Sequence, residues 1–495
     1  MSNQSFNPQD YALTPAFGMG LYYDPLYGYI PLRPQIRRAL DLPTMQRLRH
    51  ISQLSTVELV FPGATHNRLE HSVGVYHIAT TIYQTLQQRQ DDAEVAGIEF
   101  GPPLLPSHFL ALQLAALFHD VGHGPYSHVF EMFCRRNPTF THLQHERLTE
   151  RIIREGVGMY RDIPAFLLAL QEQQKDNGLP GAEFLSPQNI ARMATGQSPV
   201  DDQYTFLSQI ISDDCVDADR MDYLLRDALH CNVVSGGVDI WQIIHAFTIV
   251  PERLPTGKVV WKLKIGKEAA KAVEAILLSR DLAYRMVYYH RTHRVAQEMM
   301  IAALYELAEK NQKFSQEDLA MLTDMELLQV FGEGSAFTRD VMHRVRFRRL
   351  YEPLPFHVNL GRDLDEATQA KVLALSKPKH KEEYEARRTA EEALARKLKL
   401  GAHQRVIFDV EPIPVTSLDA YQEKVLYDEV SKYSLSLIEA LPHLEQTVDL
   451  HDRYRKECSD AQVAVPFELI AQCVSEIQQE LERGGGGGGS RGSDR

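Results

Sequence analysis

The sequence predicts a mainly α-helical protein with a helical core and a smaller α+β C-terminal part. Apolar residues recur at spacings of three and four over most of residues 34–247, which is the period of helices with one buried face. The same period returns over residues 268–310. Strand-like sequence is confined to short stretches bounded by Gly and Pro.

The elements follow in chain order. Residues 1–35 are rich in Pro, Gly and Tyr, and the string DPLYGYI predicts a short strand or hairpin. Residues 36–310 then form the predicted helical core. Residues 175–187 (KDNGLPGAEFLSP) interrupt it as a loop, and residues 253–265 (RLPTGKVVWKLKI) predict a β-hairpin with its turn at Pro-Thr-Gly-Lys.

The predicted C-terminal α+β region covers residues 311–482. Within it, residues 363–400 are charged and rich in Ala, as expected of a solvated helix, and residues 404–415 predict a strand ending at prolines. Residues 483–495 form a Gly-rich tail that we expect to be flexible.

Composition narrows the functional class. The 495 residues carry a formal charge of −13, which disfavours a surface that coats nucleic acid. The five cysteines show no C-x-x-C spacing, as expected of reduced thiols in the cytoplasm. Neither a signal peptide nor an apolar run of about 18 residues is present, so we expect a soluble cytoplasmic protein that does not bind membranes.

Four residues within helix-forming sequence predict a metal site. His71 lies in NRLEHSVGV, His119 and Asp120 lie in LFHDVGHGPYSH, and Asp219 lies in VDADRMDYLL. Imidazoles suit Zn, Fe, Ni or Mn, and the carboxylates shift the preference toward harder ions such as Mg. A single divalent ion with open positions could activate water toward a phosphoryl centre. The isolated histidines His66 and His77 have no such support, so we interpret both as structural.

The longer strings around these residues resemble a known family. The order H…HD…D resembles the HD-domain metal-dependent phosphohydrolases. FPGATHNRLEHSVGV, LFHDVGHGPYSH and DADRMDYLLRD are similar to the deoxynucleoside triphosphate (dNTP) triphosphohydrolases of the SAM-and-HD-domain type. The resemblance is strong over about residues 20–230 and weaker to about 300, and no SAM-like domain is expected before it. It implies a helical HD core and homo-oligomers, either dimers or tetramers.

The resemblance also implies a role for each matching residue. The implied metal ligands are His71, His119, Asp120 and Asp219. The implied active-site residues are His128 and His145, with Glu131 placed to orient His128. The implied phosphate contacts are Arg68, His123 and Arg220. The implied sugar contacts are Tyr223 and Asp227, while Gln53 and Leu54 would test the 3′-hydroxyl and exclude a 2′-hydroxyl.

The implied reaction is attack of water on the α-phosphorus of a dNTP, which releases a deoxynucleoside and inorganic triphosphate. His128 or His145 would handle the proton, and the sequence does not decide between them. Asp41, Gln46 and Arg49 match an allosteric site for an activator nucleotide. The Lys and Asn expected just upstream are replaced by Gly20 and Tyr23, which is a departure from the family.

Two alternatives stay open beside the dNTPase. One is an HD-type nucleotide phosphodiesterase or nuclease with the same metal; the acidic charge and the Gln53-Leu54 pair favour small nucleotides over nucleic acid. The branch that acts on cyclic dinucleotides carries Lys where this chain has His123, which disfavours it. The other alternative is a non-catalytic nucleotide sensor, disfavoured because no metal ligand or active-site histidine is missing.

Overall fold

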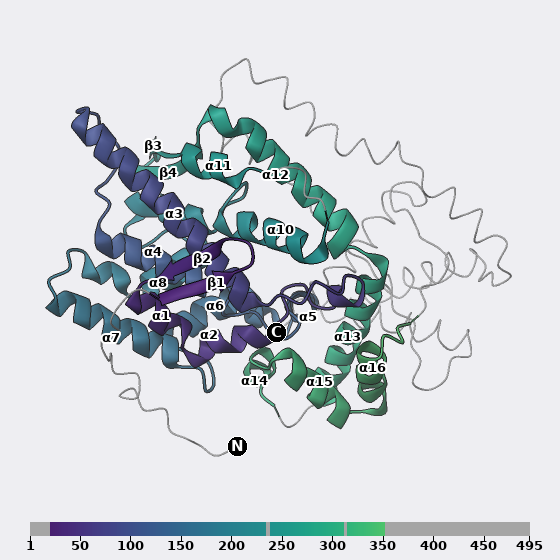
Figure 1. The fold of residues 1–495 in the computed structure, drawn as a ribbon. Coiled ribbons are helices and arrows are strands. Elements are labelled where there is room, and N and C mark those ends of the chain that lie inside the picture. Colours follow the sequence, from purple (N-terminus) through teal and green to yellow (C-terminus); the bar gives the residue numbers. More distant parts are fainter. Residues whose placement is uncertain (1–19, 234–237, 311–313, 352–495) are drawn as a thin grey trace, which may run out of the picture.

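The computed structural model describes residues 20–233, 238–310 and 314–351. Apart from two short antiparallel hairpins, the regular structure of these residues is helical (Figure 1). The predicted mainly α fold class is therefore confirmed. Three predictions concern residues outside the described part: the charged helix at 363–400, the strand at 404–415 and the Gly-rich tail at 483–495.

The N-terminal hairpin confirms the strand prediction for DPLYGYI. Strands β1 (Gly20–Asp24) and β2 (Gly28–Leu32) pair in antiparallel register, with Gly20 opposite Leu32. The Asp24 carboxylate closes the turn by accepting hydrogen bonds from the backbone amides of Leu26 and Tyr27, at 2.8 and 3.0 Å. Gly28 has a φ of +75°, which glycine adopts without steric cost.

Ten α-helices follow before residue 233. They are α1 (Pro34–Leu40), α2 (Pro43–Arg47), α3 (Arg68–Val95), α4 (Pro106–Phe118), α5 (His128–Arg136), α6 (His145–Arg154), α7 (Asp162–Asp176), α8 (Pro187–Ala194), α9 (Thr205–Ile211) and α10 (Ala218–Cys231). Short 3₁₀ turns accompany them: η2 (Leu48–His50), η3 (Val57–Leu59), η4 (Thr141–Leu143), η5 (Ala182–Leu185) and η6 (Asp202–Tyr204). Helix α4 is buried on nearly all sides and packs against α3 and α8, so it forms the centre of the core.

The remaining described elements lie after the gap at 234–237. They are α11 (Ile240–Ala246), β3 (Phe247–Arg253), β4 (Val259–Ile265), η7 (Lys267–Ala269), α12 (Ala270–Ala283), the π-helical turn η8 (Tyr284–Tyr288), α13 (Arg291–Lys310), α14 (Gln316–Ala320), α15 (Asp324–Glu333) and α16 (Ala336–Arg346). Helices α13 to α16 lie together on the right of Figure 1.

Two sequence predictions in this half need correction. The hairpin at 253–265 exists, but its first strand begins at Phe247, where the predicted helical stretch ends, because Phe247 and Ile249 alternate inward with period two. The helix predicted over 268–310 is broken between Ala283 and Arg291. There the π turn places the hydroxyl of Tyr288 within 2.5 Å of Asp227.

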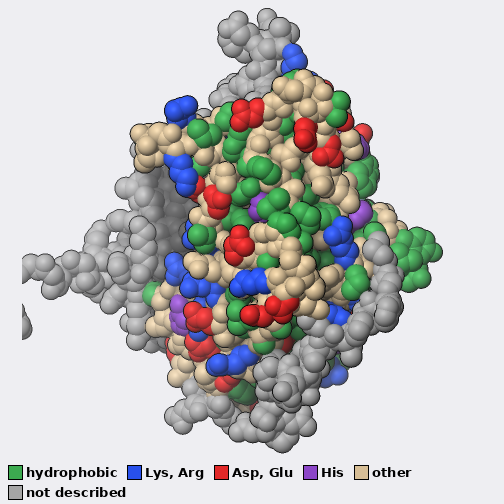
Figure 2. All heavy atoms as spheres, turned by 90° about the vertical axis from the view of Figure 1, so that its left-hand side faces the viewer, with side chains coloured by type: hydrophobic (Ala, Val, Ile, Leu, Met, Phe, Trp, Pro, Cys, Tyr) green, Lys and Arg blue, Asp and Glu red, His purple; other side chains and the backbone are tan. Residues whose placement is uncertain are grey.

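The surface of the described residues carries charges of both signs. Figure 2 shows acidic and basic side chains interspersed on one face, with apolar side chains between them. Among the helices that the structure describes, none combines the length and apolar character needed to cross a lipid bilayer.

Candidate metal centre and active site

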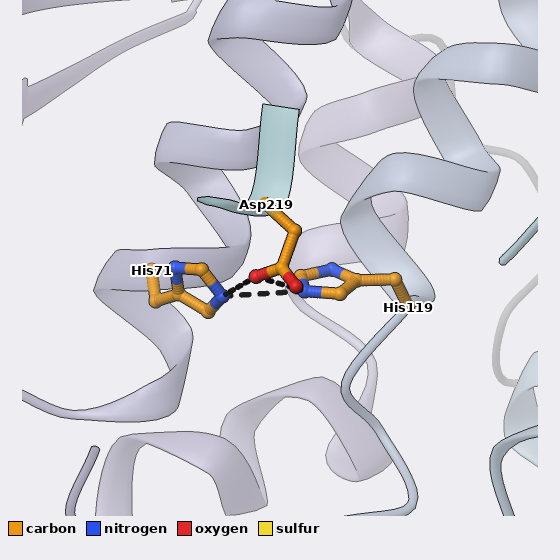
Figure 3. A group of neighbouring side chains, drawn as sticks. All are labelled: His71, His119 and Asp219. Atoms are coloured by element: carbon orange, nitrogen blue, oxygen red, sulfur yellow. Dashed lines mark hydrogen bonds and ion pairs between the residues drawn. The ribbon is translucent and has the colours of Figure 1, made fainter. Parts of the chain in front are cut away.

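Three of the four predicted metal ligands converge in the structure. His71, His119 and Asp219 come from three different helix ends and point toward one another, with the carboxylate between the two imidazole rings (Figure 3). His71 Nε2 lies 2.9 Å from Asp219 Oδ1 and 3.3 Å from His119 Nε2, and His119 Nε2 lies 3.7 Å from the same carboxylate oxygen. The histidine side chains are 1% and 6% exposed, whereas that of Asp219 is 37% exposed, so the cluster opens on the Asp219 side.

Local helix signals place these ligands. The Asn67 side chain caps α3 by accepting the amides of Leu69 and Glu70, which puts His71 in the first turn. The Asp217 side chain caps α10 in the same way and puts Asp219 in its first turn. Helix α4 ends at Phe118, as the sequence predicts, and His119 is its C-terminal cap.

Each histidine has its other ring nitrogen fixed. His71 Nδ1 donates to Asp222 Oδ2 at 2.8 Å, and His119 Nδ1 donates to the carbonyl of Ala116 at 2.8 Å. Such partners set the tautomer that leaves Nε2 free to bind a metal. Burial disfavours the charged form of His71, yet hydrogen bonds with Asp219 and Asp222 outweigh it and raise its pKa to about 10. The donor set of two imidazole nitrogens and a carboxylate, with fixed rings, fits a divalent cation.

Asp120 lies beside this cluster. Its carboxylate is 3.6 Å from His71 Nε2 and 3.5 Å from His119 Nε2, while Arg68 Nη1 approaches it to 2.5 Å. Burial would raise the pKa of Asp120, but His119, Arg68 and His123 hold it well below the usual range. Asp120 is therefore ionised and near both imidazoles, where it could be the fourth ligand.

The other predicted histidines gather next to Asp120. His123 Nε2 lies 3.3 Å from Asp120 Oδ1, and the His123 ring stacks on that of His145 with centroids 4.3 Å apart. The His128 ring lies 6.3 Å from that of His123. Burial lowers the pKa of His128 to about 3, and Arg68 and His145 add to the effect.

Glu131 differs from the prediction. Its carboxylate contacts His145 rather than His128: Oε2 lies 3.2 Å from His145 Nδ1 and accepts the His145 backbone amide at 3.0 Å. The reason is that Glu131 leans from the first turn of α5 toward the N-terminus of α6, where free amides attract a carboxylate. Burial lowers the pKa of His145, but Glu131 outweighs it and raises the value.

A residue far along the chain holds the loop before His128. Asp324, at the start of α15, accepts the amide of Tyr126 at 2.5 Å and the amide of Ser52 at 2.9 Å. Tyr126 and Ser127 both have positive φ, 54° and 43°, which costs energy for residues other than glycine. Ser127 in turn accepts a hydrogen bond from Arg68 Nε at 2.9 Å. Asp324 therefore supports a strained loop that reaches the phosphate-binding candidate Arg68.

The predicted sugar-binding residues Gln53 and Asp227 are linked through His66, whose carbonyl accepts the Gln53 amide at 3.1 Å. Gln53 and Leu54 are buried, and Gln53 Oε1 has no hydrogen-bond partner within the described part of the chain. Asp227 accepts hydrogen bonds from the Tyr288 hydroxyl at 2.5 Å and from His66 Nε2 at 2.8 Å. His66, which the sequence led us to interpret as structural, is thus a direct partner of a predicted site residue.

Other predicted residues are engaged differently or lie apart. The Arg220 guanidinium donates to the carbonyl of Asp214 at 3.0 Å and to that of Cys215, so its donors turn to the preceding loop rather than to a phosphate position. Tyr223 is half-buried on α10. Of the activator-site residues, Arg49 Nε donates to Gln46 Oε1 at 3.2 Å, and exposed Asp41 caps the end of α1. The His77 ring packs near the rings of Tyr27 and Trp241, and its carbonyl accepts a hydrogen bond from Thr81.

Two family models match the chain. An HD domain matches residues 68–158, which contain His71, His119 and Asp120. An HD associated region matches residues 238–441. Asp219 falls between the two matched segments.

Several known proteins are similar to this chain. The deoxynucleoside triphosphate triphosphohydrolase SAMHD1 of Danio rerio is 31% identical over 234 residues, which cover 44% of this chain and 35% of that protein. The protein of the same name from Gallus gallus is 27% identical over 368 residues, covering 68% and 56%. The uncharacterized protein MJ1154 of Methanocaldococcus jannaschii is 29% identical over 339 residues, covering 68% and 59%. The chain thus matches less than two thirds of the length of each relative. The chain is therefore similar to HD-domain proteins over the segment that contains two members of the His-His-Asp cluster.

Proposed function

We propose that this chain, an HD-domain protein similar to dNTP triphosphohydrolases, hydrolyses dNTPs to a deoxynucleoside and inorganic triphosphate. The observation that carries the proposal is the position of the His71-His119-Asp219 cluster beside a group of phosphate-binding donors. Arg68 contacts Asp120, and His123 lies against the same carboxylate. A triphosphate bound at the cluster would lie next to the Asp120 carboxylate and therefore near both donors.

The metal would be held by His71, His119 and Asp219, with Asp120 adjacent. A divalent ion bound there would supply Lewis acidity to a phosphoryl oxygen. The residues around it provide the remaining functions: Arg68 binds the negative charge of the phosphates, and Asp222 keeps the His71 ring in place.

We assign the proton donor to His145. Water attacks the α-phosphorus, the bond from that phosphorus to the 5′-oxygen breaks, and the leaving oxygen takes a proton. Glu131 favours the protonated form of His145, whereas burial and Arg68 favour the neutral form of His128. Two groups whose pKa values are displaced in opposite directions are suited to opposite roles in proton transfer. His145 is therefore the better acid, and His128 is left to orient water or phosphate.

The sugar would be tested by Gln53, Leu54 and Asp227. The unpartnered Gln53 Oε1 can accept a hydrogen bond from a 3′-hydroxyl, and buried Leu54 leaves no polar partner for a 2′-hydroxyl. Gln46 and Arg49, which already contact each other, remain the proposed activator site together with Asp41, and a homo-oligomer remains the proposed assembly.

The test is product analysis by ion-exchange chromatography with Mg²⁺ or Mn²⁺ and each dNTP, singly and mixed. Deoxynucleoside with intact triphosphate supports the proposal, and turnover only in mixtures supports an activator site. Monophosphate with pyrophosphate would indicate a phosphodiesterase, and no turnover in any mixture a sensor. Asp219→Asn should abolish turnover, whereas His142→Ala is the matched control, because its side chain is 45% exposed and makes no contact with the cluster that the structure describes.

A further inference from the structure

A buried arginine connects the metal cluster to the N-terminal hairpin. Arg226 on α10 donates from Nε and Nη2 to the two carboxylate oxygens of Asp222, both at 2.9 Å. Its Nη1 donates to Asp24 Oδ2 at 2.9 Å. All three side chains are 0% exposed. Two carboxylates around one guanidinium give this buried arginine full charge compensation, which a buried charge needs.

The same Asp222 carboxylate holds the metal-ligand candidate His71. The Asp222 oxygen that accepts from Arg226 Nε also accepts from His71 Nδ1, at 2.8 Å. An unbroken series of hydrogen bonds therefore runs from Asp24, through Arg226 and Asp222, to His71. Asp24 lies in the N-terminal hairpin, about 200 positions before Arg226.

Helix α3 leaves space for this series. A Cβ atom on Gly74, three residues after His71, would lie 1.8 Å from Asp222 Oδ1 and 2.5 Å from Arg226 Nη2. No side chain larger than hydrogen fits there while Asp222 keeps both partners. The close approach of α10 to α3 at this point therefore requires a glycine, one turn from His71.

We propose that the hairpin turn at Asp24 is a positioning element of the metal centre, acting through Arg226 and Asp222 on the orientation of His71. Asp24 fixes the guanidinium, the guanidinium fixes the plane of the Asp222 carboxylate by two parallel hydrogen bonds, and that carboxylate fixes the His71 ring with Nε2 toward the metal position. The inference rests on the metal centre of the proposed function and does not depend on which nucleotide is hydrolysed.

The experiment is a calorimetric titration of the full chain with Mn²⁺ alone, in the absence of nucleotide. Asp222→Asn removes the charge on the direct partner of His71 and should weaken Mn²⁺ binding by about 10- to 100-fold. Asp24→Asn is the more specific variant. Its remaining oxygen can still accept the Leu26 and Tyr27 amides, so the turn is kept, while its NH₂ group faces Arg226 and breaks that link. We expect a loss of roughly 3- to 10-fold, smaller because the contact is one step further from the ligand.

Asp281→Asn is the matched control. Asp281 pairs with Arg285 at the same i,i+4 spacing on a helix, at 2.8 Å, but near the surface and without contact to the cluster. Its Mn²⁺ affinity should equal that of the unaltered protein.

A purely structural role makes a different prediction. In that case Asp24→Asn would lower the midpoint of thermal unfolding without changing the Mn²⁺ affinity of the folded protein. Arg226→Lys tests the same link independently, because it keeps the positive charge and loses the paired hydrogen bonds to Asp222. If one of the two variants is too unstable to titrate with Mn²⁺, the other can still be measured. Unchanged Mn²⁺ affinity in either folded variant overturns the inference. If the variants lose Mn²⁺ affinity as expected but the unaltered protein turns over no dNTP, only the proposed reaction is refuted.

Discussion

Replacing Asp324 by Ala should weaken both the fold and the active site, although Asp324 lies about 200 positions after His128. The carboxylate accepts the amides of Tyr126 and Ser52 and also the Ser52 hydroxyl. In the Ala variant the buried Tyr126 amide and the partly buried Ser52 amide have no acceptor. The loop that holds Tyr126 and Ser127 at positive φ then loses the contact that balances its strain.

The magnitude follows from the groups left without partners. A buried donor without an acceptor costs about 1–3 kcal/mol, so two amides give roughly 2–6 kcal/mol. Burial raises the pKa of Asp324, which means that the charged carboxylate itself has a desolvation cost that the variant removes. We therefore expect Asp324→Ala to lower the free energy of unfolding by about 2–4 kcal/mol. Asp324→Asn keeps one acceptor oxygen and should cost about half as much.

The assay is urea unfolding followed by circular dichroism, combined with steady-state kinetics under conditions where each variant is folded. Asp318→Asn is the control, because Asp318 is an exposed acid in the preceding helix α14 that caps only its own N-terminus. In the folded Asp324→Ala protein, kcat should fall at least about tenfold, since displacement of the loop moves Arg68 and His128 from their positions. A stability loss below about 1 kcal/mol, or an unchanged kcat, would refute the reasoning.

Four further predictions follow from the described contacts. Glu131→Gln removes the charge that raises the pKa of His145, so the alkaline limb of the kcat–pH profile should move to lower pH; a stationary limb excludes His145 as the acid. Gly122→Ala places a Cβ 2.4 Å from the His145 carbonyl oxygen and from the Thr149 amide nitrogen, so it should displace α6. We expect kcat to fall about tenfold or more with little change in Mn²⁺ affinity, and an unchanged kcat would contradict this. Burial lowers the pKa of His108 to about 4, below its value of about 6.5 in the unfolded chain. Between these two values the unfolded state binds more protons than the folded state. The free energy of unfolding should therefore fall as the pH drops from about 6.5 to 4, by up to about 3 kcal/mol. His108→Asn should reduce this acid sensitivity in urea titrations at pH 7 and 5, and equal sensitivity counts against it. Leu54→Ala should lower the dNTP/NTP ratio of kcat/KM, and an unchanged ratio would remove Leu54 from the sugar site.

The sequence placed His71, His119 and Asp219 on helix ends, where the structure brings them together, because each follows a local signal. His71 lies just after the Asn67 cap, His119 at the end of an apolar helix, and Asp219 just after the Asp217 cap. Helix capping and hydrophobic period are short-range properties that a single chain displays. The mainly α fold class was predictable for the same reason.

The partners of these ligands could not be predicted in this way. Asp24 meets Arg226, and Ser52 meets Asp324, across more than 200 positions each, and no local period carries such a pairing. Glu131 illustrates a different difficulty. Its spacing from His128 is suitable for a contact within one helix, but the amide at the start of α6 attracts its carboxylate to His145. The break after Ala283 was also hidden, because the apolar spacing continues through the π turn.

The dependence of the HD segment on distant carboxylates limits how this protein can be recombined. Residues 68–158 supply both histidines of the cluster, yet the acid between them is Asp219. The acids that contact His71 and the loop before His128 are Asp222 and Asp324. A chimera that exchanged only this segment with a homologue would combine one protein's imidazoles with another's carboxylates. Transfer of the candidate site would therefore also require the segments that carry Asp219, Asp222 and Asp324, all of which lie outside the segment by which the domain is recognised.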